Sequence, residues 1–370
     1  MQCRHFGECG SCGLYALPYE EQLEEKKRRL QGLLAPFYEG EIEVYPSPPS
    51  HYRMRAEFRV WHDGKEAFYA MGNAAKNGAI TIEECPKVSL AIERRMWKLL
   101  EAINASPEVL KRKLFGVEFL SSVTDECLIT MLYHRKLDEA WQEEARKLEA
   151  VLDAHIIGRS RKQKVVLSQE YVTETVKAEN KTYRYRYYEG AFTQPNTAVN
   201  AAMIGWAKRH AVMMGGDLLE AYCGHGNFTV PLSEHFGKVL ATEISKRSIA
   251  AAHENCELNG VENITFVRMA SEEMTEALRG VRRFRRMEGV ALETYDFKAV
   301  LVDPPRAGLD EGTRALIAAT EHIIYISCNP ETLARDLEAL GATHDVVAAA
   351  MFDQFPHTTH IESGVVLKKR

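Results

Sequence analysis

The sequence contains a cysteine where a nucleophile could stand. Cys328 follows the apolar run 323–326 and precedes Asn329-Pro330, as expected where a strand ends in a turn. A thiolate in that place can add to an electrophilic carbon. The alternative is a buried structural cysteine, because free cysteines are among the most buried residues. Whether Cys328 is a nucleophile or a structural cysteine depends on which other groups could share a site with it.

A glycine-rich turn follows the predicted strand 218–222. It is the segment 222–228, YCGHGNF, and the next strand ends in Glu243, about 20 residues on, where an acidic side chain can bind both hydroxyls of a ribose. The third glycine of the dinucleotide fingerprint is missing, since Thr229 stands there. The missing glycine favours S-adenosylmethionine over a dinucleotide as the cofactor, because S-adenosylmethionine has no pyrophosphate for the turn to bind.

A third candidate group follows the predicted strand 299–302. The loop 303–309, DPPRAGL, contains Asp303 and Arg306. In enzymes that methylate amino groups, a similar Asn/Asp-Pro-Pro loop ends in an aromatic residue that stacks on the target base. Arg306 stands in that place, which argues against methylation of adenine N6 or cytosine N4.

Cys328 suits methylation at carbon-5 of a pyrimidine. Addition of a thiolate to carbon-6 makes carbon-5 nucleophilic by producing an enolate. A base must then remove the carbon-5 proton so that the thiol can leave. Glu362, beside the last predicted strand, supplies a carboxylate for this step. Alone it would be a surface charge, but together with the cofactor turn and Asp303 it favours catalysis.

The composition is that of an ordinary globular protein. The 370 residues suffice for about two domains, and hydrophobic and charged contents of 45% and 27% exclude disordered and fibrous classes. No apolar run approaches the ~20 residues of a membrane span, and the first residues lack the apolar core of a secretory signal. A cytoplasmic location is therefore expected. The net charge of -5 means that any nucleic acid must be bound by local patches.

The second half of the chain alternates predicted strands with helical patterns. The apolar runs are 218–222, 239–242, 264–267, 299–302, 323–326, 346–351 and 365–368. They predict a doubly wound, Rossmann-like α/β sheet of about seven strands. The preceding chain predicts an α+β domain, with helices at 19–34, 90–105 and 137–152 and strands at 117–120, 127–133, 155–158 and 164–167. The predicted domains are 1–18, cysteine-rich; 19–190, α+β; and 191–370, α/β.

Basic residues could form RNA-binding surfaces at three places in the chain. In the strand-like segment 51–61, period-2 alternation puts Arg53, Arg55, Glu57 and Arg59 on one face, which is either a phosphate platform or a solvated surface. The run 183–187, YRYRY, could stack bases, or its tyrosines could be the inward face of a strand. The segment 282–286, RRFRR, is either an RNA contact or a solvated helix end.

Three cysteines lie close together at the start of the chain. Cys3, Cys9 and Cys12 form a C-x5-C-x2-C run, and Cys85 is the best candidate for a fourth ligand. Four thiolates suit an iron-sulfur cluster or zinc, and the spacing alone decides neither. A frayed terminus with idle thiols is the alternative.

From residue 19 onward the chain resembles the tRNA (uracil-5-)-methyltransferase family, the RNA 5-methyluridine methyltransferases. The similar segments are HYRMRAEFR (51–59), FTQPN (192–196), DPPR (303–306), SCNPETL (327–333) and FDQFP (352–356). The resemblance implies a class I methyltransferase domain preceded by an α+β RNA-binding domain. It also implies Cys328 as nucleophile and Glu362 as base.

The same resemblance implies where cofactor and substrate bind. The implied S-adenosylmethionine site comprises Gln194, Tyr222, Asn227, Glu243 and Asp303, with Phe192 and Gln194 near a flipped uracil. Arg53 and Arg55 are the candidate RNA contacts. His225 lies inside the cofactor turn, where the tRNA enzymes usually carry Asn, so a small change in cofactor affinity is expected.

The implied reaction is methylation of carbon-5 of the T-loop uridine, position 54, in tRNA. The expected partner is the T-arm of tRNA, with tmRNA or another T-loop-like RNA as further candidates, and no membrane or protein partner. Cys3, Cys9, Cys12 and Cys85 resemble the [4Fe-4S] pattern of related ribosomal-RNA enzymes, which favours a cluster over zinc. A 23S ribosomal RNA uracil-5-methyltransferase is therefore the alternative enzyme, and an RNA chaperone that needs no turnover is the alternative from another class.

Overall fold

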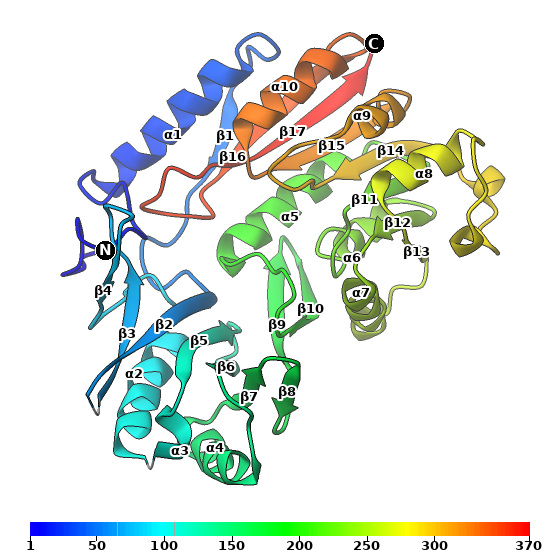
Figure 1. Cartoon of the computed structure of the whole chain (residues 1–370). Coiled ribbons are helices and arrows are strands. Elements are labelled where there is room, and N and C mark those ends of the chain that lie inside the picture. Colours follow the sequence, from blue (N-terminus) through cyan, green and yellow to red (C-terminus); the bar gives the residue numbers. More distant parts are fainter. Residues whose placement is uncertain (65, 107) are drawn as a thin grey trace.

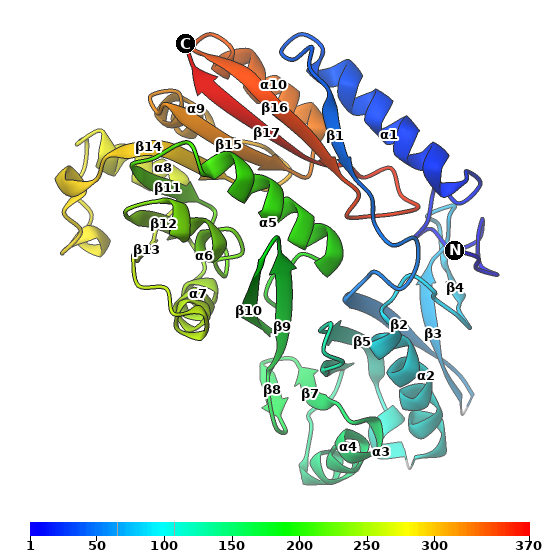
Figure 2. The same cartoon turned by 180° about the vertical axis from the view of Figure 1, so that it is seen from behind.

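The computed structural model describes residues 1–64, 66–106 and 108–370 (Figure 1). Within those residues the strands form an eight-stranded sheet, a seven-stranded sheet and a two-stranded ribbon. The eight-stranded sheet contains the C-terminal strands, and the ribbon lies between the two larger sheets (Figures 1 and 2).

The eight-stranded sheet has the order β1-β16-β17-β15-β14-β11-β12-β13. Its strands are β1 (Ile42–Tyr45), β11 (Asp217–Ala221), β12 (Val239–Glu243), β13 (Ile264–Arg268), β14 (Phe297–Val302), β15 (His322–Ser327), β16 (His344–Phe352) and β17 (Glu362–Lys369). All neighbours pair in parallel except β17, which is antiparallel to β15 and β16. The seven predicted strands are present, but the predicted strand number is wrong by one. The extra strand, β1, comes from the N-terminal part of the chain and pairs with β16.

Helices cover both faces of this sheet, because successive side chains of its strands point to opposite sides. One face packs against α5 (Thr197–Ala211), α6 (Thr229–Leu232) and α7 (Lys246–Asn259). The other packs against α1 (Tyr19–Leu34), α8 (Ser271–Leu278), α9 (Glu311–Ile317) and α10 (Pro330–Leu340). Short 3-10 helices lie at Ser233–His235, Arg285–Met287 and Leu292–Thr294. The sheet is therefore doubly wound, as the sequence predicts.

The seven-stranded sheet has the order β4-β3-β2-β5-β6-β7-β8. Its strands are β2 (Arg55–Asp63), β3 (Glu66–Gly72), β4 (Ala79–Thr81), β5 (Leu114–Ser121), β6 (Cys127–Tyr133), β7 (His155–Ser160) and β8 (Gln163–Val166). The associated helices are α2 (Leu90–Ala105), α3 (Glu108–Lys111) and α4 (Glu139–Leu152). Ile92, Met96 and Trp141 pack into the core under the sheet. On β2, Glu57 and Arg59 are exposed and Arg55 is half-buried, which confirms the predicted polar face.

The two-stranded ribbon consists of β9 (Tyr171–Ala178) and β10 (Lys181–Tyr188). It packs against α5 and α7. Tyr183, Tyr185 and Tyr187 are at most 2% exposed and belong to the core beneath α5. The tyrosines are therefore the inward face of a strand and are not available to stack RNA bases.

The N-terminal part of the chain crosses the predicted domain boundary. Leu30, Leu34 and Ile42 share a core with Leu333 and Leu337 of α10, so α1 and β1 pack in the layers of the C-terminal sheet (Figure 1). The division of the chain at residues 18 and 190 stays a prediction. Among the described residues, no helix combines the length and apolar character needed to cross a membrane.

Candidate active site

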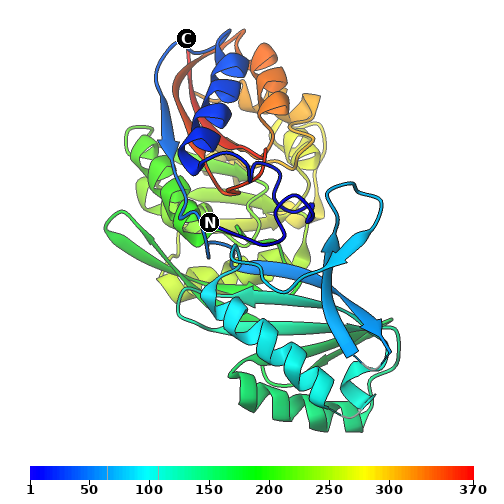
Figure 3. The same ribbon diagram turned by 90° about the vertical axis from the view of Figure 1, so that its left-hand side faces the viewer.

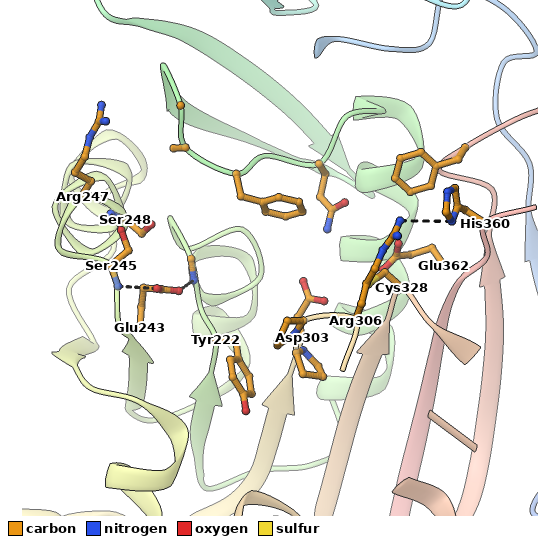
Figure 4. A pocket seen from close by; sticks show the side chains of 18 residues that line it. Tyr222, Glu243, Ser245, Arg247, Ser248, Asp303, Arg306, Cys328, His360 and Glu362 are labelled. Atoms are coloured by element: carbon orange, nitrogen blue, oxygen red, sulfur yellow. Dashed lines mark hydrogen bonds between the residues drawn. The ribbon is translucent and has the colours of Figure 1, made fainter. Parts of the chain in front are cut away.

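A cavity of about 640 Å³ opens at the carboxyl ends of the central parallel strands (Figure 4). In open α/β sheets, ligands bind at this edge. The predicted site residues that line the cavity are Phe192, Gln194, Tyr222, Glu243, Asp303, Cys328 and Glu362. Four of them follow or end neighbouring strands: Tyr222 after β11, Glu243 on β12, Asp303 after β14 and Cys328 after β15. The topology therefore brings the predicted nucleophile, the acidic residues and the predicted cofactor turn together.

Three of the predicted cofactor and RNA contacts do not line this cavity. Asn227 is buried behind the turn, where it exchanges two hydrogen bonds of 2.9 Å with the side chain of Asn200. Arg53 and Arg55 lie at the rim. The Arg53 guanidinium is 5.9 Å from the ring centroid of Phe355, and that of Arg55 donates to the carbonyl of Ala191; Phe355 and Ala191 both line the cavity.

The turn after β11 has an unusual backbone. Tyr222, Gly224 and Gly226 have φ of 64°, 57° and 87°. Glycine adopts this left-handed conformation readily, whereas a tyrosine there is uncommon and indicates a functional constraint. The Tyr222 hydroxyl forms a hydrogen bond of 2.7 Å with the Ser271 hydroxyl, so the ring is fixed at the cavity wall.

Glu243 has the geometry expected of a ribose ligand. Its two carboxylate oxygens accept backbone hydrogen bonds, from the Gly224 N–H at 3.1 Å and the Ser245 N–H at 2.8 Å (Figure 4). A carboxylate has about four acceptor sites, so two remain for ligand hydroxyls. The space beside the α-carbon of Gly224, where a side chain would stand, is empty within 4 Å. These residues fit S-adenosylmethionine.

A second cavity, of about 480 Å³, shares Tyr222 and Glu243 with the first. Ile244, Met269 and Leu309 add apolar surface to it, and Ile244 is 70% exposed. A flat, apolar heterocycle such as adenine suits this wall. These residues were not predicted from the sequence, although an isoleucine directly after the acidic end of β12 was a usable signal.

Three acidic groups share the floor of the active-site cavity. Burial is the largest of the effects that raise the pKa of Cys328 to about 11; the nearby carboxyls of Glu362 and Asp303 act in the same direction, and Arg306 opposes them. Glu362 is 3% exposed, and burial, with Asp303 nearby, raises its pKa well above the ordinary value. Burial also raises the pKa of Asp303 to about 7. Each group therefore holds its proton more firmly than in water.

Arg306 is the cation beside this acidic group. Its carbonyl accepts from Asn329 Nδ2 at 3.0 Å and Thr332 Oγ1 at 3.3 Å, which ties the 303–309 loop to the turn that carries Cys328. Its Nη2 lies 3.5 Å from Nδ1 of His360 (Figure 4). His360 and Phe355 also line the cavity, with ring centroids 5.7 Å apart. Neither residue was predicted from the sequence to belong to the site.

The four N-terminal cysteines converge on a separate place. Cys3, Cys9, Cys12 and Cys85 are half-buried free thiols that line one cavity of about 30 Å³. Burial raises the pKa of Cys85 to about 11 and also raises the pKa of Cys3 and of Cys12. In the part of the chain that the structure describes, no three His, Cys, Asp or Glu side chains are arranged to hold a metal ion. The metal-ligand assignment therefore stays a prediction.

Comparison with known proteins identifies relatives along the whole chain. A protein from Sulfurovum sp. (strain NBC37-1), named tRNA/tmRNA (uracil-C(5))-methyltransferase, is 65% identical over 100% of both chains. Proteins of the same name from Sulfurimonas denitrificans and Neisseria meningitidis serogroup A are each 52% identical. The match to the Sulfurimonas protein covers 100% of both chains. The match to the Neisseria protein covers 95% of this chain and 99% of the relative.

A solved structure shows the same fold. The crystal structure of Pyrococcus abyssi tRNA (uracil-54, C5)-methyltransferase in complex with S-adenosyl-L-homocysteine matches with a TM-score of 0.73 at 21% identity, over 96% of this chain and 84% of that one. The predicted class I methyltransferase fold is confirmed. The family model described as tRNA (Uracil-5-)-methyltransferase matches residues 18–370. The chain belongs to the tRNA (uracil-5-)-methyltransferase family.

Proposed function

We propose that the protein transfers a methyl group from S-adenosylmethionine to carbon-5 of uridine 54 in the T-loop of tRNA, giving 5-methyluridine. The observation that carries the proposal is that Cys328 and Glu362 share one cavity with Asp303 and with Glu243, the proposed ribose ligand. The names of the full-length relatives support tRNA and tmRNA as the substrate class.

The cofactor is proposed to occupy the side of the cavity formed by β11 and β12. Glu243 would bind the ribose hydroxyls, and Tyr222, Asp303 and Gln194 would line the rest of the site. When bound, S-adenosylmethionine supplies an electrophilic methyl group on a sulfonium. Its adenine would lie against Ile244 in the adjoining cavity.

Cys328 is the proposed nucleophile. Its sulfur forms a bond to carbon-6 of uracil, the carbon-5=carbon-6 double bond opens, and the electron pair moves into an enolate that makes carbon-5 nucleophilic. The reactive species is the thiolate, and the high pKa of the thiol keeps it scarce in the free protein. Arg306 is the nearby charge that favours the thiolate.

Glu362 is the proposed base. Once carbon-5 carries both a methyl group and its original proton, the Glu362 carboxylate accepts that proton. The carbon-5=carbon-6 double bond then reforms, and Cys328 leaves as a thiolate. Burial to 3% exposure raises the pKa of Glu362, so its carboxylate form is scarcer than in water but is a stronger base, and the nearby Arg306 favours that ionised form.

The uracil must leave the base stack, because carbon-6 cannot be attacked inside it. Phe192 is 73% exposed while it also lines the cavity, so its ring can contact an extruded base at the entrance. Arg53 and Arg55 stand at the same rim and can hold phosphates of the T-arm. Because tRNA is processed in the cytoplasm, we expect the protein to act there.

Cys3, Cys9, Cys12 and Cys85 are proposed to hold a [4Fe-4S] cluster, with zinc as the alternative. The support is that four half-buried thiols from distant parts of the chain line one cavity. Anaerobic purification followed by absorbance, iron and sulfide assay tests this. A coloured protein with iron and sulfide supports the cluster, stoichiometric zinc without colour supports zinc, and no metal leaves idle thiols.

A modification map tests the reaction and the substrate together. The protein is incubated with S-adenosylmethionine and unmodified tRNA, tmRNA or 23S ribosomal RNA, and methylated nucleotides are located by nuclease digestion and mass spectrometry. We expect 5-methyluridine at position 54 of tRNA and none with C328A. Methylation of 23S ribosomal RNA alone would replace the tRNA proposal with the ribosomal alternative.

A further inference from the structure

The β16–β17 loop, residues 353–361, brings several groups to the active site. Phe355 and His360 line the cavity from this loop, and Glu362 follows it as the first residue of β17. Loops move more readily than the strands that they join. A base that removes a proton from one particular carbon must be held in place, since a misplacement of about 1 Å can slow a reaction ~10²-fold. Something must therefore fix this loop.

One face of α1 binds the loop. Tyr19, Gln22, Lys26 and Arg29 are spaced by three, four and three residues, which puts them on the same side of a helix. Each makes a hydrogen bond to a residue of the β16–β17 loop. Figure 3 shows the loop beside the N-terminal half of α1.

The central contact is a buried ion pair. Lys26 Nζ donates to Asp353 Oδ1 at 2.6 Å and to the carbonyl of Phe355 at 3.0 Å, and the Tyr19 hydroxyl donates to Asp353 Oδ2 at 2.7 Å. Lys26 is 3% exposed and Asp353 2%. Burial lowers the pKa of Lys26, and Asp353 opposes that shift. A charge buried to this degree needs its partner, so the pair fixes the start of the loop on α1.

A second contact fixes the middle of the loop. The His357 N–H donates to Gln22 Oε1 at 2.9 Å, and Gln22 Nε2 lies 3.1 Å from His357 Nδ1. His357 Nε2 lies 2.9 Å from the carbonyl of Pro49, and burial lowers the pKa of the ring. A neutral ring with its proton on Nε2 satisfies all three contacts. The backbone of His357 is left-handed, with φ of 63°, a conformation that these contacts must maintain.

We propose that Lys26 and Asp353 are positioning residues of the methyl-transfer reaction. Through their ion pair, α1 holds the β16–β17 loop so that Phe355, His360 and Glu362 face the substrate base. This inference rests on the proposed function. Although α1 and Glu362 lie near opposite ends of the sequence, α1 would then help to hold the proposed base in position.

The variant K26M tests the inference. It leaves Asp353 buried without its cation, so the loop should loosen. We expect the turnover of folded protein to fall ~10²-fold, in line with a displaced base. The affinity for S-adenosylhomocysteine should change less than about twofold, because Glu243 lies on the other side of the cavity from Glu362 (Figure 4). Hydrogen exchange should increase within residues 353–361.

The control is K208M. Lys208 is 4% exposed and forms an ion pair of 2.5 Å with Glu234, on the face of the sheet opposite α1. Its loss should reduce stability while turnover per folded molecule stays within about twofold of native, as expected for a distant site. If K26M does not fold, Y19F keeps the ion pair and removes the hydroxyl that donates to Asp353 and accepts from the Ser47 N–H, and it should reduce turnover by about threefold to tenfold.

Two results would overturn the inference. One is a folded K26M or Y19F protein with native turnover and native exchange in residues 353–361. The other is a K26M protein whose turnover falls no further than that of K208M, because an equal fall in both variants would reflect a general loss of stability. A native protein that does not methylate carbon-5 of uracil would instead refute the proposed function, and the exchange measurement would still test whether Lys26 holds the loop.

Discussion

Burial opposes the ionisation of Cys328, Asp303 and Glu362 in the free protein. Each has a pKa above its ordinary value, chiefly through burial, and the carboxyls raise the pKa of the thiol further. Arg306 is the opposing charge. The thiol is therefore largely protonated near neutral pH, which protects it from unwanted reactions until a substrate is bound.

This arrangement predicts how covalent addition depends on pH. At pH values below the Cys328 pKa of about 11 most of the thiol is protonated, so each unit of pH increases the thiolate fraction about tenfold. We expect the rate at which Cys328 bonds to RNA containing 5-fluorouracil to rise by about that factor per unit between pH 7 and 9. Quenched-flow sampling on denaturing gels measures it, with RNA binding by C328A as the control. A rate that is flat across this range contradicts the account.

Single residues show how far the sequence could be interpreted. That Cys328 and Glu362 share one cavity could be predicted, because the proposed chemistry needs a nucleophile and a base beside a cofactor turn. Lys26 could not be predicted in the same way. Within the run Lys26-Lys27-Arg28-Arg29 it looks like one more exposed charge on a surface helix, yet it is buried. Its partner Asp353 is more than 300 residues away, and no local pattern reveals such a pair.

At the scale of elements, β17 places Glu362, the proposed base. It is antiparallel to β15, which ends beside Cys328, and the pairing of Ser327 with Ser363 brings the start of β17 next to that turn. Glu362 begins the strand, and Gly364 follows two residues later. A β-carbon at Gly364 would lie 2.8 Å from Cζ3 of the buried Trp206.

The variant G364A should therefore displace β17. We expect it to reduce the free energy of unfolding by about 1–3 kcal/mol and to slow methyl transfer, because the same strand carries Glu362. G32A is the matched control. A β-carbon at Gly32 of α1 meets nothing within 4 Å, and alanine should leave stability unchanged or raise it by about 0.5–1 kcal/mol. Denaturant unfolding measures the free energy of unfolding of G364A and G32A. Equal values for the two variants would show that β17 accommodates the added β-carbon and would contradict the prediction.

Most elements could be predicted from hydrophobic periodicity. The helices 19–34 and 90–105 and the strand 127–133 agree with the structure at both ends. β1 could not be predicted, because its four residues are too few to show a period and only Ile42 is fully buried. β1 lies beside β16 because the C-terminal part of the chain packs against the N-terminal part, and this contact is a property of the tertiary fold.

At the scale of the whole molecule, the catalytic sheet is completed by the N-terminal part of the chain. β1 pairs with the edge of β16, and α1 covers the α10 side of the sheet. The β9–β10 ribbon contributes three buried tyrosines to the opposite face. A methyltransferase unit that begins at residue 191 would expose all of these apolar surfaces.

Truncation tests this view of the fold. Residues 191–370 alone should show no cooperative unfolding and should not bind S-adenosylhomocysteine, because an unpaired edge and an uncovered core favour aggregation. A fusion of residues 1–50, through a long Gly/Ser linker, to residues 167–370 restores α1, β1 and the ribbon. We expect it to unfold cooperatively and to bind the ligand. A fragment 191–370 that unfolds like the full-length protein would contradict this dependence.

The central claim is that Cys328 bonds to carbon-6 of a tRNA uracil. Its most direct test is to incubate the protein with S-adenosylmethionine and tRNA that carries 5-fluorouracil, whose carbon-5 fluorine cannot be removed as a proton, and to sequence the adduct by mass spectrometry. The account predicts a nucleotide bonded to the peptide that contains Cys328, and no adduct with C328A. An adduct on another residue, or efficient carbon-5 methylation by C328A, would contradict it.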